Sequence, residues 1–239
     1  MQRVRVIWLA CAVTLAASVA VTSVATAALP EFVPLKGAGA FPVAFSSQHI
    51  EGLVPTLQTV SGTTIECAKD SSVGEIANAK EVHNMVITYK ECKSSIGGEC
   101  TTGGQPKATI VTKSLIGRFE YLKKASPIIV GLILSPGTGT TFAEFTCGTS
   151  KVVIASNLAT SGLIGAFAST QINVTLPEFQ LDFNQKSGVQ EFTEFENEAK
   201  EIVKNVFLRT SINGGTSAQT GLFDKHLLKL TAEEGQIKA

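Results

Sequence analysis

The chain has 239 residues, of which 44% are hydrophobic and 17% charged, and its 20 basic residues balance its 20 acidic ones. A balanced charge excludes the broad basic surface that drives nucleic-acid binding, so no nucleic-acid partner is expected. Loss of Arg3 and Arg5 with the leader described next would leave 18 of the 20 basic residues against 20 acids, a net charge of −2. The remaining length suffices for a single all-β domain with its own core.

Residues 1–27 have the pattern of a secretory signal peptide. Arg3 and Arg5 precede an almost wholly apolar run from Val6 to Val21, and the small residues Ala25 and Ala27 suit cleavage after position 27. A retained membrane anchor is the weaker interpretation, because the apolar run is short and ends in small residues. We therefore expect a secreted or envelope-associated protein with no stable membrane span after cleavage.

The rest of the chain shows no long linker and no low-complexity tract. We divide it into an N-terminal extension at 28–53, which need not be fully ordered, and a single β domain at 54–239. Apolar residues alternate with polar ones at 83–89, at 115–121 and around Cys67, which predicts strands with one face in a core. Continuous apolar runs at 128–134 and 152–155 predict strands that are buried on both faces or that line a barrel.

Two later segments depart from simple alternation. Between residues 171 and 183 the apolar positions change parity at Pro177, which predicts a bulge or a bent edge strand. The segment 190–206 instead shows helical spacing, with a capping box and an i,i+4 ion pair. We expect a surface helix there, and the alternative is an amphipathic partner or membrane helix, which the acidic polar face disfavours at anionic lipid. The predicted fold is all-β, a mainly antiparallel sandwich or partly closed barrel with one helix near 190–206.

Four cysteines follow the leader: Cys67, Cys92, Cys100 and Cys147. An even number in an exported chain favours two disulfides, and three pairings are open. We favour Cys92–Cys100 with Cys67–Cys147, because a short bridge would staple the flexible loop 93–99. The cysteines lack the close C-x2–4-C spacing of zinc sites, so we assign no metal or cofactor ligand.

Blocks of sequence around these cysteines have a distinctive order. The blocks are 64–67, 73–76, 89–92, Cys100, 115–117, Tyr121, 130–132, 142–148 and 151–153. This order resembles a family of uncharacterised exported proteins of soil actinobacteria, over roughly residues 56–215. The resemblance implies a secreted β domain with the same four cysteines. It implies no catalytic or binding residue, because the family has no assigned activity. The charged stretch 194–206 departs from the family, which is shorter and contains glycine there.

Candidate catalytic residues are few. After the leader the histidines are His49, His83 and His226, and the aspartates are Asp70, Asp182 and Asp224. The motifs G-x-S-x-G, S-x-x-K and H-E-x-x-H are absent from the sequence. A Ser-His-Asp triad whose members meet only in space stays open. We interpret His83 and His226 as strand residues at the sheet margin, and His49 is the least constrained.

Glu66 and Glu144 lie close to Cys67 and Cys147 in the sequence. If those cysteines pair, the two carboxylates would share one region and could act as the acid and base of a glycoside hydrolase. The simpler interpretation places both at solvent-facing strand positions.

We therefore expect an exported, disulfide-stabilised domain with a non-enzymatic structural or binding role. Its partner would be an unknown protein, an envelope component or a small apolar ligand. The alternative function is a carrier of such a ligand, because the 13 phenylalanines could line a barrel cavity. A secreted hydrolase is the second alternative.

Overall fold

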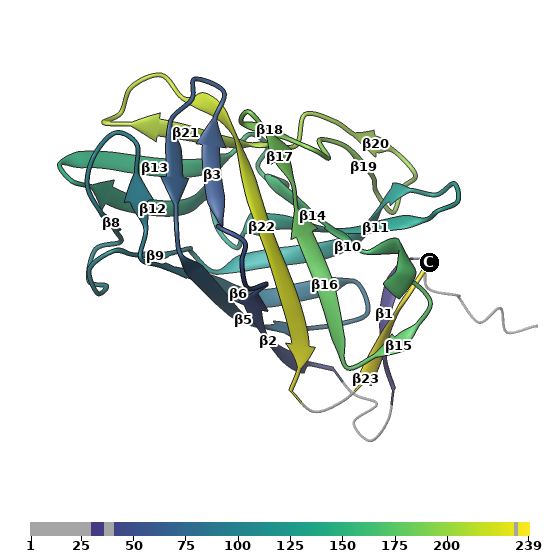
Figure 1. The fold of residues 1–239 in the computed structure, drawn as a ribbon. Coiled ribbons are helices and arrows are strands. Elements are labelled where there is room, and N and C mark those ends of the chain that lie inside the picture. The colour runs from purple at the N-terminus through teal and green to yellow at the C-terminus, as the bar shows by residue number, and fades with distance from the viewer. Residues whose placement is uncertain (1–29, 36–40, 232–233) are drawn as a thin grey trace, which may run out of the picture.

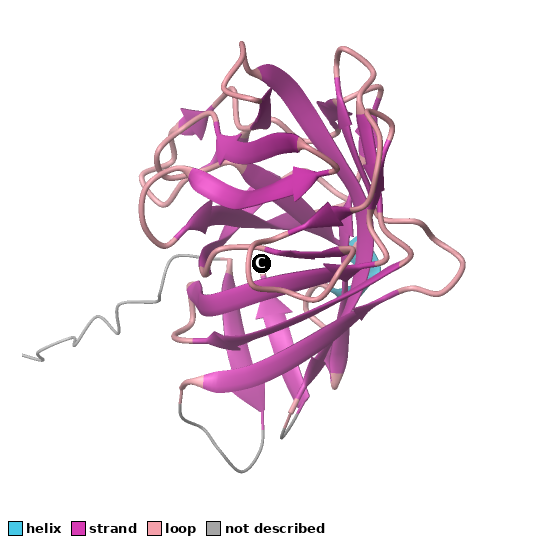
Figure 2. Ribbon diagram, turned by 90° about the vertical axis from the view of Figure 1, so that its left-hand side faces the viewer, coloured by secondary structure: helices cyan, strands magenta, loops and turns pink. Residues whose placement is uncertain are grey.

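The computed structural model describes residues 30–35, 41–231 and 234–239. In these ranges the regular structure is almost entirely β-strand, and the one helical segment is a 3-10 turn at Ser169–Gln171, drawn in cyan in Figure 2. The predicted leader, 1–27, lies outside the described residues. Among the residues described, no helix is long and apolar enough to cross a membrane.

One set of antiparallel strands closes into a barrel, which we call the first barrel (Figure 1). In order around it the strands are β22 (Ala218–Leu230), β2 (Val43–His49), β5 (Lys69–Ile76), β6 (Glu81–Lys90), β10 (Leu115–Lys123), β11 (Ile129–Pro136), β14 (Leu163–Phe167) and β16 (Glu178–Phe183). Strand β16 pairs again with β22, so this sheet has no open edge.

A second ring of strands shares β22 with the first barrel. Its other members are β3 (Thr56–Thr59), β4 (Thr64–Glu66), β7 (Lys93–Ser94), β8 (Cys100–Thr101), β12 (Thr141–Cys147), β13 (Ser150–Ser156) and β21 (Leu208–Ile212). A bridge between Lys93 and Glu99 joins β7 to the start of β8 and closes the ring. The short β9 (Thr109–Val111) pairs with β6 of the first barrel.

Strand β22 changes its partners along its length. Its first half pairs with β21 and β3, and from Asp224 onward it pairs with β16 and then β2. Figure 1 shows β22 running diagonally, with β3 beside its upper half and with β16 and β2 on opposite sides of its lower half. One continuous strand therefore sets the position of the second ring relative to the first barrel.

A small outer sheet closes one end of the first barrel. It consists of β1 (Glu31–Leu35), β23 (Glu234–Lys238) and β15 (Thr175–Leu176). Phe32 of β1 is buried against Phe119 and Phe179 of the barrel, with ring centroids 6.3 and 6.1 Å away. Offset and edge-on aromatic contacts of this kind stabilise a core beyond the area that they bury.

The expected strands are confirmed. The segments predicted at 83–89, 115–121, 128–134 and 152–155 overlap β6, β10, β11 and β13. Strand β11 is buried on both faces, as its continuous apolar run predicts. The parity change at Pro177 separates β15 from β16, and these two strands belong to the outer sheet and to the first barrel respectively. A proline at this position ends one ladder where the chain turns into the next.

The helix predicted near 190–206 is wrong. The segment follows a small hairpin, β17 (Gln185–Lys186) and β18 (Val189–Gln190), and it contains a second hairpin, β19 (Phe195–Glu196) and β20 (Ile202–Val203). Its apolar residues do not form one face, because Phe195 and Val206 are buried while Ile202 is 53% exposed. We call 191–207 the strap, because it covers the outside of the first barrel.

The predicted boundary at residue 54 does not coincide with a structural one. Strand β2, which lies in the segment expected to be an N-terminal extension, pairs with both β22 and β5. Without β2 the first barrel would be open between these two strands. The domain therefore begins upstream of residue 54.

The four cysteines form two disulfides, as predicted, but the favoured pairing is wrong. The bridges are Cys67–Cys92 and Cys100–Cys147, each with Cα atoms 4.0 Å apart. Strands β5 and β6 pair with Lys69 opposite Lys90, and the same register continued outward places Cys67 opposite Cys92. Cys100 and Cys147 are themselves register partners in β8 and β12. Antiparallel registry brings these β-carbons close, and loop length alone does not reveal it.

Removal of either bridge should lower stability without altering the other bridge. The closed loops span 25 and 47 residues, so the chain-entropy relation predicts a loss of about 3.5 kcal/mol for Cys67→Ala/Cys92→Ala and about 4 kcal/mol for Cys100→Ala/Cys147→Ala. Guanidinium unfolding of each double variant measures the loss. Mass mapping of unreduced peptides checks the pairing, and a peptide pair linked through Cys92 and Cys100 would contradict it.

Candidate functional site

A polar cluster lies inside the first barrel, close to the point where β22 changes partners. Asp224 and His226 of β22 and Asp70 of β5 point inward, and their exposed fractions are 1%, 0% and 5%. Ser47 of β2 and Ser72 of β5 lie in the same layer and are also buried. The residues come from three adjacent strands, because β2 pairs with β22 on one side and with β5 on the other. Asp224 and His226 point inward together because inward positions recur every second residue along a strand.

His226 is the centre of this cluster. Its Nε2 lies 2.9 Å from Asp224 Oδ2, and its Nδ1 lies 3.0 Å from Asp70 Oδ1 and 3.1 Å from Ser47 Oγ. The Ser47 and Ser72 hydroxyl oxygens are 2.6 Å apart and share a hydrogen bond. The carboxylates are near the ring nitrogens in distance only, because neither contact has the alignment of a hydrogen bond.

Burial and the mutual proximity of Asp70, Asp224 and His226 shift the pKa values of the cluster. Burial and the nearby Asp224 carboxylate raise the pKa of Asp70 to about 7, although His226 acts in the opposite direction. Burial alone would lower the pKa of His226, but Asp224 and Asp70 outweigh it and raise that pKa. Burial, followed by Asp224 and Asp70, also raises the pKa of Tyr89 well above its ordinary value. The folded protein therefore holds protons in this layer more tightly than the free side chains would.

Ser47, His226 and Asp224 meet in the order of a nucleophilic triad, the arrangement that the sequence left open. The Ser47 hydroxyl is held between His226 and Ser72, and the residue is only 2% exposed. A substrate carbonyl must approach within bonding distance of such a hydroxyl. The closed barrel wall stands in the way, so this geometry does not favour hydrolysis.

An apolar cavity lies inside the second ring, next to the polar cluster. Its volume is about 60 Å³, and its walls include Leu57, Phe142, Phe145 and Leu222, with Tyr89 on the side of the cluster. Pockets that bind small molecules commonly measure roughly 300–1,000 Å³. The phenylalanines of the described chain therefore mostly fill the interior, and the space left is too small for a sizeable apolar ligand.

The histidines interpreted from the sequence have separate surroundings. His83 is partly exposed on β6 and lies 3.2 Å from the Glu81 carboxylate, as expected for a residue at a sheet margin. His49 accepts a hydrogen bond on Nδ1 from the Asp70 backbone N–H at 3.3 Å. His226, which we also expected at a margin, is wholly buried, and that expectation is wrong.

Glu66 and Glu144 do not form a hydrolase pair. The disulfide that would have linked their regions is not formed, because Cys67 bonds to Cys92. Glu66 is exposed on β4, and Glu144 makes an exposed ion pair with Lys151 at 2.8 Å. Both occupy the solvent-facing strand positions of the simpler interpretation.

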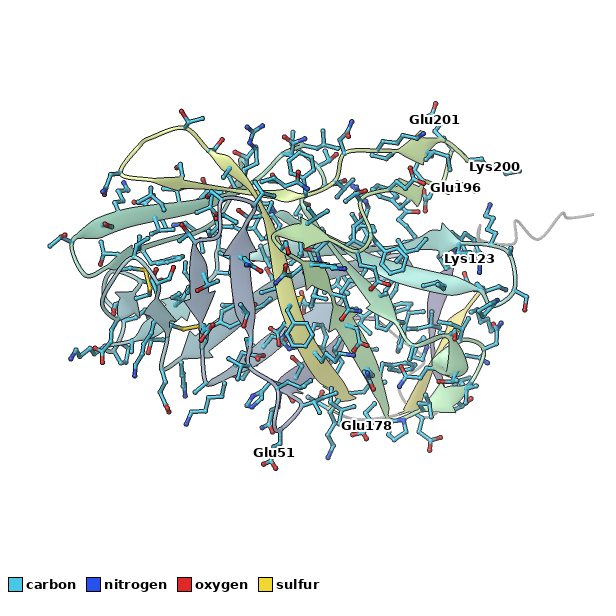
Figure 3. The ribbon with its side chains drawn as sticks, turned by 45° about the horizontal axis from the view of Figure 1, so that its top comes forward. Glu51, Lys123, Glu178, Glu196, Lys200 and Glu201 are labelled. Carbon is cyan, nitrogen blue, oxygen red and sulfur yellow. A yellow bond between two sulfur atoms is a disulfide. The ribbon has the colours of Figure 1, made fainter. Side chains whose placement is uncertain are left out.

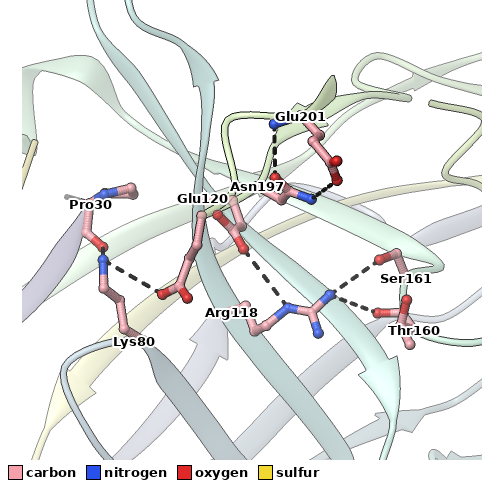
Figure 4. Close-up of polar contacts among 9 residues, drawn as sticks. Pro30, Lys80, Arg118, Glu120, Thr160, Ser161, Asn197 and Glu201 are labelled. Atoms are coloured by element: carbon pink, nitrogen blue, oxygen red, sulfur yellow. Dashed lines mark hydrogen bonds and ion pairs between the residues drawn. The ribbon is translucent and has the colours of Figure 1, made fainter. Parts of the chain in front are cut away.

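A larger pocket opens on the outside of the first barrel, between β10 and the strap (Figure 4). Its volume is about 390 Å³. Arg118 and Glu120 occupy the outward phase of β10, and Phe195 and Val203 of the strap add apolar surface. The strap keeps its shape through Asn197, whose side chain accepts a hydrogen bond from the Glu201 backbone N–H at 2.9 Å and donates one to the Glu201 carboxylate.

The charged groups of this pocket differ in how far they are already engaged. Arg118 donates to the Thr160 carbonyl at 3.1 Å, and Lys80 donates to the Pro30 carbonyl at 2.7 Å. Glu120 is only 4% exposed, and its closest charged neighbour is the Arg118 Nε at 3.9 Å. Burial raises the pKa of Glu120 to about 7, against the opposing effect of Arg118. This carboxyl is thus buried with a single ion-pair contact, at 3.9 Å.

Sequence reasoning missed both sites, although one signal was available. Leu222, Leu228 and Leu230 share the inward phase of β22 with Asp224 and His226. Polar residues in the apolar phase of a strand indicate a buried polar cluster. Glu120 offered no such signal, because the strap that covers it comes from a distant part of the chain.

Comparison of the chain with protein-family models, with curated proteins and with solved structures finds no match in any of the three. The fold and the two sites are therefore interpreted from their own geometry.

Stability should depend on pH through Glu120. Its pKa is about 7 in the folded protein and 4.5 in a free side chain, so the folded state binds this proton more tightly. This contribution to the free energy of unfolding is therefore present below pH 4.5 and is lost as the pH rises toward 7, by at most about 3 kcal/mol. The charges that face the carboxyl are Arg118, Lys80 and Glu198.

The variant Glu120→Gln keeps the shape of the side chain and removes the titration. Its free energy of unfolding, measured with urea, should rise relative to wild type between pH 4.5 and pH 7. A difference between the two proteins that stays constant over this range would contradict the assigned pKa.

Proposed function

We propose that this protein is an exported, disulfide-stabilised β domain that acts by binding a ligand and not by catalysis. Two disulfides between buried cysteines fit an oxidising extracytoplasmic compartment. The sequence of residues 1–27 supports export through the secretory route. The role would be exerted at the cell envelope or outside the cell.

The observation that carries the binding role is the pocket between β10 and the strap. It combines an incompletely paired, buried carboxyl with apolar surface from Phe195 and Val203. Eight of its twelve lining residues are polar or charged, and convergent polar groups beside apolar surface are what orient a bound ligand. Because Arg118 and Lys80 are already engaged by backbone carbonyls, Glu120 is the group that a ligand would satisfy.

The chemistry of the pocket favours a ligand with a positive charge beside an apolar group. Glu81, Glu120 and Glu198 outnumber the two cations around the pocket. A cationic group next to Glu120 would stabilise its ionised form and lower its pKa. Basic and aromatic side chains of a peptide have this combination, so we take a short basic peptide of a protein partner as the ligand class.

Two other functions are less well supported. The apolar cavity of about 60 Å³ leaves little room for the ligand of a carrier. The hydroxyl of Ser47 lies behind the barrel wall, which opposes a hydrolase.

Export and cleavage are tested by native mass spectrometry of the protein collected from its own export pathway. We expect the mass of residues 28–239 less four hydrogens, because the leader is removed and two disulfides form. Full-length protein retained in the cytoplasm, with free thiols, would contradict export. An additional mass that dissociates on unfolding would identify a retained ligand.

Binding is tested with the dipeptide amide Arg-Phe-NH2, titrated into the oxidised protein and followed by NMR chemical shifts. We expect shifts at β10 and the strap, and an affinity loss of about tenfold or more for Glu120→Gln, equivalent to about 1.4 kcal/mol. The control Glu51→Gln makes the same change at a site that Figure 3 shows on the opposite side of the molecule from Glu196 and Glu201. Equal affinity of the two variants, or equal binding of Glu-Phe-NH2, would refute this ligand class.

A further inference from the structure

The buried layer of the first barrel contains three side chains that can ligate a metal ion. Asp70, Asp224 and His226 each offer one ligand atom, and these atoms all lie within 4.8 Å of one another. All three side chains are at most 1% exposed. Their strands β5 and β22 are held on either side of β2, so the backbone fixes the spacing of the three groups.

The cluster contains more hydrogen-bonding atoms, mostly carboxylate acceptors, than it has partners to satisfy them. All four carboxylate oxygens of Asp70 and Asp224, and the Nε2 of His226, make no hydrogen bond of acceptable geometry. Leaving one buried polar atom unsatisfied costs about 1–3 kcal/mol, and more when the group is charged. The atoms face one another across the layer, so a single positive ion between them would satisfy several at once.

The charges of the cluster also favour a bound cation. Within the described chain, the ion pairs of Asp70 and Asp224 are made only to His226, and no lysine or arginine reaches either carboxylate. With the imidazole neutral, two carboxylates leave a charge of −2 in the core. A divalent cation would bring the whole layer to neutrality, which is the condition under which buried charge is tolerated.

We propose that Asp70, Asp224 and His226 form a binding site for a divalent transition-metal ion, with zinc as the best fit. Two carboxylate oxygens and one imidazole nitrogen match the ligand preferences of zinc, with water or a further side chain in the fourth position. The site uses none of the cysteines and is independent of the proposed peptide pocket.

The neighbouring hydroxyls are placed to orient the imidazole. Ser47 Oγ lies 3.1 Å from Nδ1 of His226, and Ser72 lies behind Ser47. A metal-bound histidine commonly donates its second N–H to an acceptor that fixes the ring. With Nδ1–H donating to Ser47, the Nε2 atom is the ligand that faces Asp224.

Because the cluster is sealed, the ion would enter as the barrel closes, and the test must allow for this. The full protein is unfolded in guanidinium without reductant, which keeps both disulfides, and is stripped with EDTA. It is then refolded with either zinc chloride or EDTA and desalted. Bound zinc is measured by elemental mass spectrometry, and Tm by calorimetry.

We expect one zinc ion per chain and a Tm raised by roughly 5–10 °C over the protein refolded in EDTA. Asp224→Asn keeps the side-chain shape but should retain no zinc, whereas His83→Ala, which removes a histidine outside the barrel, should bind like wild type. Refolded wild type without zinc, or Asp224→Asn with wild-type zinc content, would overturn the proposal and leave a cluster that shares protons.

A second measurement covers the case in which Asp224→Asn does not fold. Wild type refolded with cobalt(II) should show the visible absorption of a protein-bound, low-symmetry ion, and zinc should displace it on refolding. A spectrum identical to that of free cobalt(II) would equally overturn the site.

Discussion

The hydrogen-bond ladder of β22 is the constraint on which the rest of the molecule depends. This strand belongs to two closed rings at once, and it exchanges one pair of neighbours for another near Asp224. A barrel without edges requires every strand to find two partners, and β22 does so twice. The positions of the second ring and of the buried polar layer follow from its course.

The polar layer lies where this exchange takes place. Its buried ionisable groups are not expected to increase the stability of the fold relative to apolar residues. Buried ionisable groups are costly, and replacing them with apolar residues is often neutral or favourable. Leu228 and Leu230 fill the same inward phase of β22 a few residues later without this cost. Leucine therefore fits the inward positions of β22. The presence of Asp224 and His226 at two of these positions is better explained by a bound ion or proton than by packing.

Local patterns predicted the strands and the break at Pro177, because each depends on neighbouring residues, and the even number of cysteines predicted two bridges. The features that failed depend on contacts distant in sequence. Cys67 meets Cys92 through strand register, and Asp70 meets His226 only after the barrel closes. In a short segment that packs on a surface, the spacing of apolar residues distinguishes a helix from a strand poorly. The sequence of the strap was therefore interpreted as a helix.

Phe195 and Val206, two apolar residues of the segment predicted as a helix, fasten the strap to the barrel. Phe195 and Val206 are buried with Ile133 and Ile164 in a small apolar cluster on the outer faces of β11 and β14. The strap also pairs Glu196 with Tyr121 of β10 at its one point of β-contact. Between these attachments it stands away from β10, and that gap is the pocket over Glu120. The buried carboxyl and the apolar walls of the pocket thus have a single cause, a segment whose apolar side chains anchor it on an already closed barrel.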